Sequence, residues 1–232
     1  AAYVVGFAAY RRQRRGRGDA LGALERLQTG AAAICGAALG SKVLHHLNDW
    51  EGLMAHLGEP AYLAGGRTIV GGLAGGLLAV ETTKRVLGIR SRTGELYAIP
   101  LCIGIAVGRV GCFLTGVEDE TWGVPTDLPW GLRAGDEWAR HPTPLYEIAF
   151  VVLLAVGLRA GRGALRRVSG REFQIFLGAY MGLRFAVDFL KPTATLIAGL
   201  TPIQIVAGLV ALHQLFLLAR GAGSVPSSEN VA

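Results

Sequence analysis

The chain contains the apolar run Leu101-Cys-Ile-Gly-Ile-Ala-Val-Gly-Arg-Val-Gly-Cys-Phe-Leu-Thr-Gly116, which is typical of a membrane-embedded helix and nevertheless carries Arg109. A guanidinium is permanently charged, and placing one in hydrocarbon costs on the order of 3 kcal/mol or more unless a partner neutralises it. Such a residue indicates a site that binds an anion or moves a charge. The glycines around it allow another backbone or a lipid headgroup to approach closely.

The composition favours a polytopic α-helical membrane protein over a soluble domain. Of the 232 residues, 51% are hydrophobic and only 17% are charged, and 34 are glycine. The cysteines Cys35, Cys102 and Cys112 lie in apolar stretches without metal-ligand spacing, which predicts neither a disulfide framework nor a metal site. The net charge of +6 is concentrated in short loops between apolar runs, a pattern that argues against nucleic-acid binding.

Apolar segments recur along the chain and predict an all-α protein with about seven transmembrane helices. We interpret the first, which has only ten apolar residues, as part of a longer helix with an upstream piece missing, since about 20 residues are needed to span a bilayer. Residues 1–220 are expected to form a single integral membrane domain. The seven apolar segments are 1–10, 28–45, 68–83, 95–115, 145–158, 173–190 and 201–219.

The distribution of basic residues predicts the orientation of these helices. One set of loops and the end of the last helix hold 16 of the 23 lysines and arginines, so the positive-inside rule places that side in the cytoplasm. The N-terminus is then outside, the C-terminus is cytoplasmic, and residues 221–232 are expected to be a disordered tail. The basic segments are 11–27, 84–92, 159–171 and Arg220.

The segment 117–144 faces outward on this interpretation. It is rich in acidic residues, proline and glycine, and its tryptophans Trp122, Trp130 and Trp138 are suited to the headgroup level of a membrane. A functional loop and a plain interfacial cap both fit this composition.

Two arginines are predicted at the same depth below the outer surface. Arg109 lies six residues before Thr115 and Arg184 six residues before Leu190, which corresponds to roughly 9 Å at 1.5 Å per residue. A shared anionic partner, such as a phospholipid phosphate, would relieve the repulsion between them. For Arg184 the alternative is an ion pair with Asp188, four residues further along its helix. Arg109 has no acidic residue within one turn.

Further candidates lie in Arg140-His-Pro-Thr-Pro-Leu-Tyr-Glu147, which leads into the fifth apolar segment. Arg140 and His141 are predicted near the interface, with Tyr146 and Glu147 just inside it. Glu147 is suited either to counter an arginine or to act as a base. The ordinary pKa of an imidazole, about 6.5, is suited to proton transfer, so His141 is a second candidate base. The alternative is a structural role, which is more common for a lone histidine at the interface.

These motifs resemble those of the prolipoprotein diacylglyceryl transferases. The likeness covers nearly the whole chain and preserves the order of the seven segments. The matching stretches are Gly108-Arg-Val-Gly-Cys-Phe-Leu-Thr-Gly116, Trp122-Gly-Val-Pro-Thr126, Arg140 to Glu147, Gly182-Leu-Arg-Phe-Ala-Val-Asp-Phe189, Leu200-Thr-Pro-Ile-Gln204 and the glycine-rich Gly71-Gly-Leu-Ala-Gly-Gly76.

No long helix with a polar seam indicates an oligomer, so we expect a monomer, and the resemblance implies an enzyme of the bacterial inner membrane. It would move a diacylglyceryl group from phosphatidylglycerol to the cysteine thiol of a prolipoprotein lipobox, at the outer leaflet and without a metal or organic cofactor. By this resemblance the catalytic candidates are Arg109, Arg184, His141 and Glu147. The candidates for binding phosphatidylglycerol are Arg109, Arg140, Arg184, Gly111, Gly116, Gly123, Tyr146 and Gln204.

The sequence departs from the family pattern at positions that bear on the chemistry. Val70 replaces a family histidine that is a candidate base, and Cys112 replaces a family asparagine. Glu118 and Glu120 are both candidates for the acidic residue of the family motif. His141 or Glu147 would then serve as the base, or the thiol would need none. The alternatives are a phospholipid-binding paralogue with another acceptor or no catalysis and, ranked last because the chain shows no internal repeat, an anion transporter.

Overall fold

The computed structural model describes residues 2–17, 21–119, 121–165, 168–193, 195 and 198–222. The described chain is mostly helical, with one two-stranded antiparallel sheet that pairs Leu132 with Arg140. The elements in order are α1 Ala2–Arg17, α2 Ala23–Asn48, α3 Trp50–Ala55, α4 Pro60–Ala64, α5 Ile69–Val86, the 3-10 turn η1 Gly94–Leu96, α6 Ala98–Thr115, the 3-10 turn η2 Gly116–Asp119, β1 Leu132–Arg133, β2 Ala139–Arg140, α7 Thr143–Ala160, α8 Arg162–Leu165, α9 Arg171–Asp188 and α10 Pro202–Ala222.

The prediction of a mainly α-helical protein is confirmed, and each of the seven apolar segments lies largely within one long helix, α1, α2, α5, α6, α7, α9 or α10. Three stretches of the described chain are long and apolar enough to cross a membrane: Gly94–Glu118, Thr143–Ala160 and Pro202–Arg220. An 18-residue helix rises about 27 Å, close to the thickness of the hydrocarbon core.

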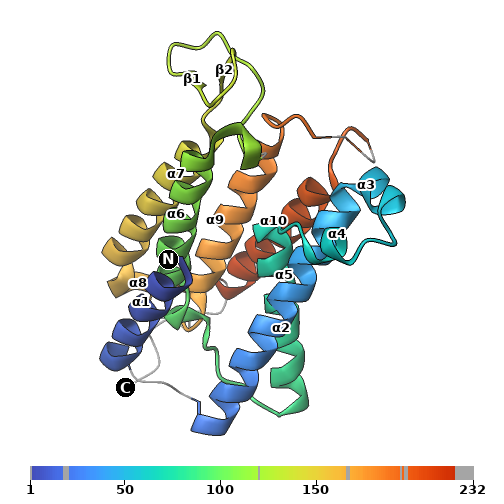
Figure 1. Cartoon of the computed structure of the whole chain (residues 1–232). Helices are drawn as coiled ribbons and strands as arrows, with labels where there is room; N and C mark the ends of the chain where they lie inside the picture. The colour runs from blue at the N-terminus through green and yellow to red at the C-terminus, as the bar shows by residue number, and fades with distance from the viewer. Residues whose placement is uncertain are drawn as a thin grey trace, which may run out of the picture.

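The helix α9 is central and carries much of the core. Its side chains Phe176, Leu177, Tyr180 and Met181 are all fully buried. In Figure 1 it lies between α6 and α10, and α10 is its main packing partner. Polar side chains on α9 are therefore held deep inside the bundle.

The closest helix pair is α2 with α5, where glycines face each other. A Cβ added to Gly40 would lie 2.4 Å from the carbonyl oxygen of Gly71, and one added to Gly75 would lie 2.3 Å from that of Gly36. Both distances are far below van der Waals contact, so these positions accept only glycine unless the helices separate. Close approach through small residues is typical of helix pairs in membranes.

The two ends of the bundle differ in composition. The β1–β2 hairpin stands at the top of Figure 1, whereas the basic second half of α1 and the basic end of α5 lie in the lower half. At the hairpin end, α3 and α4 form a separate small lobe in which Tyr62 donates a hydrogen bond to Asp49. That hydrogen bond holds the pKa of the Asp49 carboxyl below its ordinary value.

The outer surface of the helices exposes large apolar side chains. Among them Leu78, Leu114, Leu153 and Leu212 are each exposed by about two thirds or more. Water-exposed leucines on this scale are unusual in soluble proteins, whereas contact with lipid explains them.

Two predictions concern the ends of the chain. The first helix runs on from its apolar part to Arg17, so its second half is basic. The last helix extends to Ala222. Most of the predicted disordered tail, residues 223–232, lies outside the described residues.

Candidate functional site

Three helices bring five buried polar side chains into one group, which we call the charged cluster: Arg109 from α6, Glu147 from α7, and Tyr180, Arg184 and Asp188 from α9. None of the five is more than 5% exposed. Two guanidiniums and two carboxylic acids in such a setting require partners, because an unpaired buried charge is strongly destabilising.

Glu147 lies between the two arginines. Its Oε2 is 3.0 Å from both Nε and Nη2 of Arg109, and its Oε1 is 2.7 Å from Nη1 of Arg184. The hydroxyl of Tyr180 donates a third hydrogen bond to Oε2, at 3.0 Å. One carboxylate therefore fixes the spacing of two guanidiniums that would otherwise repel each other.

A second carboxylate, that of Asp188, supports Arg184 from the same helix, with Nη2 of Arg184 3.5 Å from its Oδ1. The hydroxyl of Thr201 donates to Oδ2 of Asp188. Thr201 and Gln204 form a reciprocal pair at the start of α10, in which the Thr201 amide donates to Gln204 Oε1 and the Gln204 amide donates to Thr201 Oγ1. The start of α10 is thereby joined to the charged cluster.

Helical periodicity explains why α9 contributes three members. Tyr180, Arg184 and Asp188 are four residues apart, so they lie along one face of the helix. Arg184 and Asp188 were candidates from the sequence, whereas Tyr180 was not. Its spacing of four residues before Arg184 is the signal that would have revealed it.

Two nitrogens in the cluster have capacity for a ligand. Among the described residues, Nε of Arg184 is buried and has no hydrogen-bond partner. Nη1 of Arg109 makes a long contact, 3.7 Å to the Sγ of Cys112. An unsatisfied buried donor costs roughly 1–3 kcal/mol, so an oxygen ligand that accepts from these nitrogens would be stabilised.

The predicted interfacial residues form a second group next to the hairpin. The hydroxyl of Tyr146 accepts a hydrogen bond from Trp130 Nε1 at 2.9 Å and lies 3.2 Å from Nδ1 of His141. Arg140 donates from Nε to Asp136 at 2.6 Å. Both Arg140 and His141 are partly exposed, so the structure places these predicted site residues at the rim and not among the five residues of the charged cluster.

The three predicted glycines have different surroundings. Gly111 has open space where a side chain would be, which leaves that face of α6 accessible. Gly116 has a positive φ of 77°, and a Cβ there would lie 2.4 Å from the Ala134 carbonyl oxygen. A Cβ on Gly123 would lie 2.7 Å from that of His141. Gly116 and Gly123 therefore allow the loop to fold tightly against the helix ends.

The residues that depart from the family pattern are spread over the structure. Val70 is 1% exposed and belongs to the apolar core, so it contributes no polar group. Cys112 is partly exposed beside Arg109, and Glu118 is exposed in η2. Glu120 lies outside the described residues. Within the described part of the chain, no three His, Cys, Asp or Glu residues are grouped to hold a metal ion.

Comparison with known proteins gives a match over almost the full chain. The family model described as prolipoprotein diacylglyceryl transferase matches residues 1–220. A protein of Solidesulfovibrio magneticus is 32% identical over an alignment that covers 98% of this chain and 91% of that protein. Its name is phosphatidylglycerol–prolipoprotein diacylglyceryl transferase.

Two other relatives carry the same name. The protein of Bordetella avium is 33% identical and that of Methylococcus capsulatus is 35% identical, each over 68% of this chain. The chain spans about three fifths of the length of these two relatives, 61% and 60%.

Proposed function

The chain belongs to the prolipoprotein diacylglyceryl transferase family, and from that membership we propose that it moves a diacylglyceryl group from phosphatidylglycerol to a lipobox cysteine of a prolipoprotein. The relatives are named for this donor and this class of acceptor. The chain would act in the bacterial inner membrane as a monomer. Its partners would be phosphatidylglycerol, the lipobox segment and the surrounding lipid.

The observation that carries the proposal is the pair of buried arginines with nitrogens left to donate. Arg184 keeps a buried Nε without a partner in the described structure, and Nη1 of Arg109 makes a long contact of 3.7 Å to Cys112 Sγ. A phosphate diester offers anionic oxygens, and guanidinium groups are well suited to bind them. The open space at Gly111 offers a route for a lipid headgroup to approach along α6.

In the proposed reaction the sulfur of the client thiolate attacks the glyceryl carbon that bears the phosphate ester. The S–C bond forms, the C–O bond breaks, and the electron pair leaves with the phosphate oxygen as glycerol phosphate. Negative charge grows on that oxygen, and Arg109 and Arg184 would stabilise it in the transition state. Positioned donors of this kind contribute on the order of 100-fold or more in rate.

The thiol must also lose a proton, and the geometry favours different roles for the two candidate bases. Both oxygens of Glu147 already accept hydrogen bonds, from Arg109, Arg184 and Tyr180. We therefore assign Glu147 to positioning the arginines. His141 is partly exposed at the rim, where a client thiol would arrive, and its Nδ1 lies 3.2 Å from the hydroxyl of Tyr146. It is the better candidate to accept the proton.

The membrane arrangement is part of the proposal. All seven long helices would lie in the bilayer, with the hairpin end outside and the basic end in the cytoplasm. The charged cluster, toward the hairpin end of α6 and α9, would then face the outer leaflet. Arg140, Tyr146 and Gln204 would contribute to the lipid site from its margins.

The test is transfer of labelled diacylglycerol from phosphatidylglycerol to a lipobox peptide, together with rescue of a bacterial strain depleted of its own transferase. Arg109→Ala is expected to lower the transfer rate about 100-fold or more. Arg133→Ala, an exposed arginine of the hairpin, serves as the matched control and is expected to transfer at the normal rate. Absence of transfer and rescue by the unaltered chain would overturn the proposal.

A second function, phospholipid binding without this transfer, is favoured by one observation. The position at which the family carries a histidine is occupied by the buried apolar Val70. A chain of this kind would bind phosphatidylglycerol through Arg109 and Arg184 and form no thioether product. The same assay separates the two functions, because only the transferase converts bound lipid to product.

A further inference from the structure

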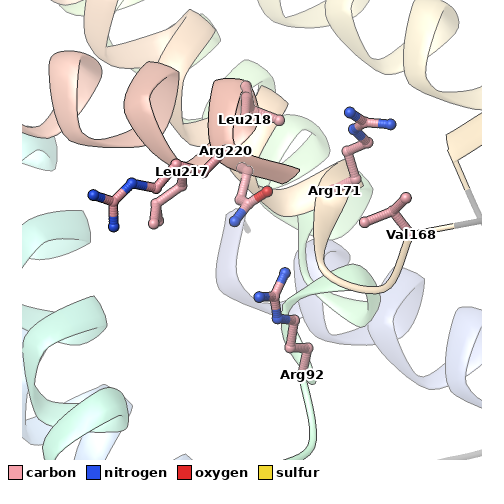
Figure 2. A pocket seen from close by; sticks show the side chains of 7 residues that line it. Arg92, Val168, Arg171, Leu217, Leu218 and Arg220 are labelled. Carbon is pink, nitrogen blue, oxygen red and sulfur yellow. The ribbon is translucent and has the colours of Figure 1, made fainter. Parts of the chain in front are cut away.

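A pocket of about 290 Å³ lies at the basic end of the bundle, away from the charged cluster. Three separate parts of the chain line it. The segment before η1 contributes Arg92, and the start of α9 contributes Arg171, its first residue, together with Val168 just before the helix. The end of α10 contributes Leu217, Leu218 and Arg220. Figure 2 shows that the three arginines come from different elements, with the guanidiniums of Arg171 and Arg220 pointing away from each other.

Local contacts hold Arg92 in place. Its Nη1 donates to the carbonyl oxygen of Ser169 at 3.1 Å. Its aliphatic part lies against Gly170, where an added Cβ would approach Cδ of Arg92 to 2.9 Å. Gly170 has a positive φ of 85°, and its amide donates to Glu95 Oε1 at 2.6 Å. The turn before α9 thus presents Arg92 to the pocket in a defined position.

The lining combines cationic and apolar side chains. Three of the seven described lining residues are arginines and none is acidic. Leu217, Leu218 and Val168 supply an apolar wall, and the guanidinium of Arg220 lies 4.1 Å from the ring centre of the exposed Phe216. An anionic group next to a short apolar segment is the chemistry that this lining matches.

The volume decides how much of a ligand can enter. The pocket volume of about 290 Å³ is at the lower limit for typical ligand pockets, whose volumes start at about 300 Å³. A phosphate with its glycerol fits such a space, and two acyl chains do not. The chains would have to lie outside, where α10 exposes Leu212, Leu215 and Phe216, each by half or more.

We propose that this pocket binds the phosphate of an anionic phospholipid in the leaflet at the basic end of the bundle. The arginines would surround the phosphate, Leu217 and Leu218 would contact the glycerol region, and the acyl chains would follow α10. Basic pockets between helices on the cytoplasmic side of a membrane are suited to anionic headgroups. The proposal rests on the proposed membrane placement and is independent of the transfer reaction.

The test is native mass spectrometry of the full chain in detergent with phosphatidylglycerol or phosphatidylcholine added. The unaltered chain is expected to retain one more anionic lipid than the double variant Arg92→Gln/Arg171→Gln. We expect that lipid to bind the double variant about 30-fold more weakly, from the loss of two arginine–anion contacts. The matched control is Arg85→Gln/Arg159→Gln, which removes two exposed arginines from the same end without altering the pocket lining.

A variant that keeps every arginine guards against a general effect of charge. Leu218→Trp fills the cavity and is also expected to lose the lipid. Equal loss in the pocket and control pairs, equal binding of phosphatidylcholine, or binding of soluble glycerol 3-phosphate as tight as that of the lipid would each overturn the proposal. All of these readouts are independent of transfer activity. We expect the double variant to keep that activity, because the charged cluster lies toward the other end of α6 and α9.

Discussion

At the scale of single residues, Glu147 determines the electrostatics of the site. It receives hydrogen bonds from two guanidiniums and one phenol, and its side chain is 1% exposed. A buried ion pair adds little stability compared with a well-packed apolar alternative, yet removing one partner leaves the other charges uncompensated. The arrangement therefore serves to hold Arg109 and Arg184 at a fixed spacing.

Replacing Glu147 with glutamine is expected to destabilise the protein by about 3–5 kcal/mol, because two arginines lose their shared counter-charge. The measurement is thermal unfolding in detergent. Asp136→Asn is the control, since the Asp136–Arg140 pair is partly exposed at the rim and its loss should cost about 1 kcal/mol or less. Similar losses in the two variants would contradict the central role of Glu147.

Replacing Arg184 with lysine tests whether the planar guanidinium matters. Arg184 contacts Glu147 and Asp188 through different nitrogens and still retains a free Nε. A single ammonium cannot reproduce that geometry. We expect Arg184→Lys to lower transfer at least tenfold while the chain remains folded. A normal rate in the lysine variant would show that charge alone is sufficient.

At the scale of elements, the pairing of α2 with α5 illustrates how glycines permit close helix contact. Gly36 and Gly40 on one helix meet Gly71 and Gly75 on the other at distances that exclude a methyl group. The glycine-rich segment 71–76 is one of the stretches that carry the family resemblance. Its packing role became clear only when the facing glycines of α2 were seen opposite it.

Gly40→Ala is expected to force α2 and α5 apart and to cost about 1–3 kcal/mol of stability, because the new methyl would meet the Gly71 carbonyl. Thermal unfolding in detergent measures the change. Gly30→Ala in the same helix has open space and should be neutral or stabilising, through higher helix propensity. A stable Gly40→Ala protein would contradict the close contact.

At the scale of the whole molecule, the two ends are chemically distinct. The hairpin end carries the exposed tryptophans Trp130 and Trp138, whereas the opposite end carries most of the basic residues. The structure gathers the basic segments at one end (Figure 1), as the alternation of loops predicted. Which end faces the cytoplasm remains our prediction, from the positive-inside rule.

Cysteine labelling in intact cells checks the orientation. In a background where Cys35, Cys102 and Cys112 are serine, Glu137→Cys in the hairpin loop should react with a membrane-impermeant maleimide from outside. Arg85→Cys, in the last turn of α5, should react only once the membrane is opened. The reverse pattern would show that the positive-inside interpretation is wrong.

The sequence by itself determined the seven helical segments, the gathering of basic loops on one side and the family, because hydropathy, helix periodicity and short motifs are properties of neighbouring residues. Only the tertiary structure decided which acid pairs with which arginine. Glu147 is 38 residues from Arg109 and 37 from Arg184 in sequence. Their contact depends on how α6, α7 and α9 are rotated against one another, a result of side-chain packing along the whole length of the helices.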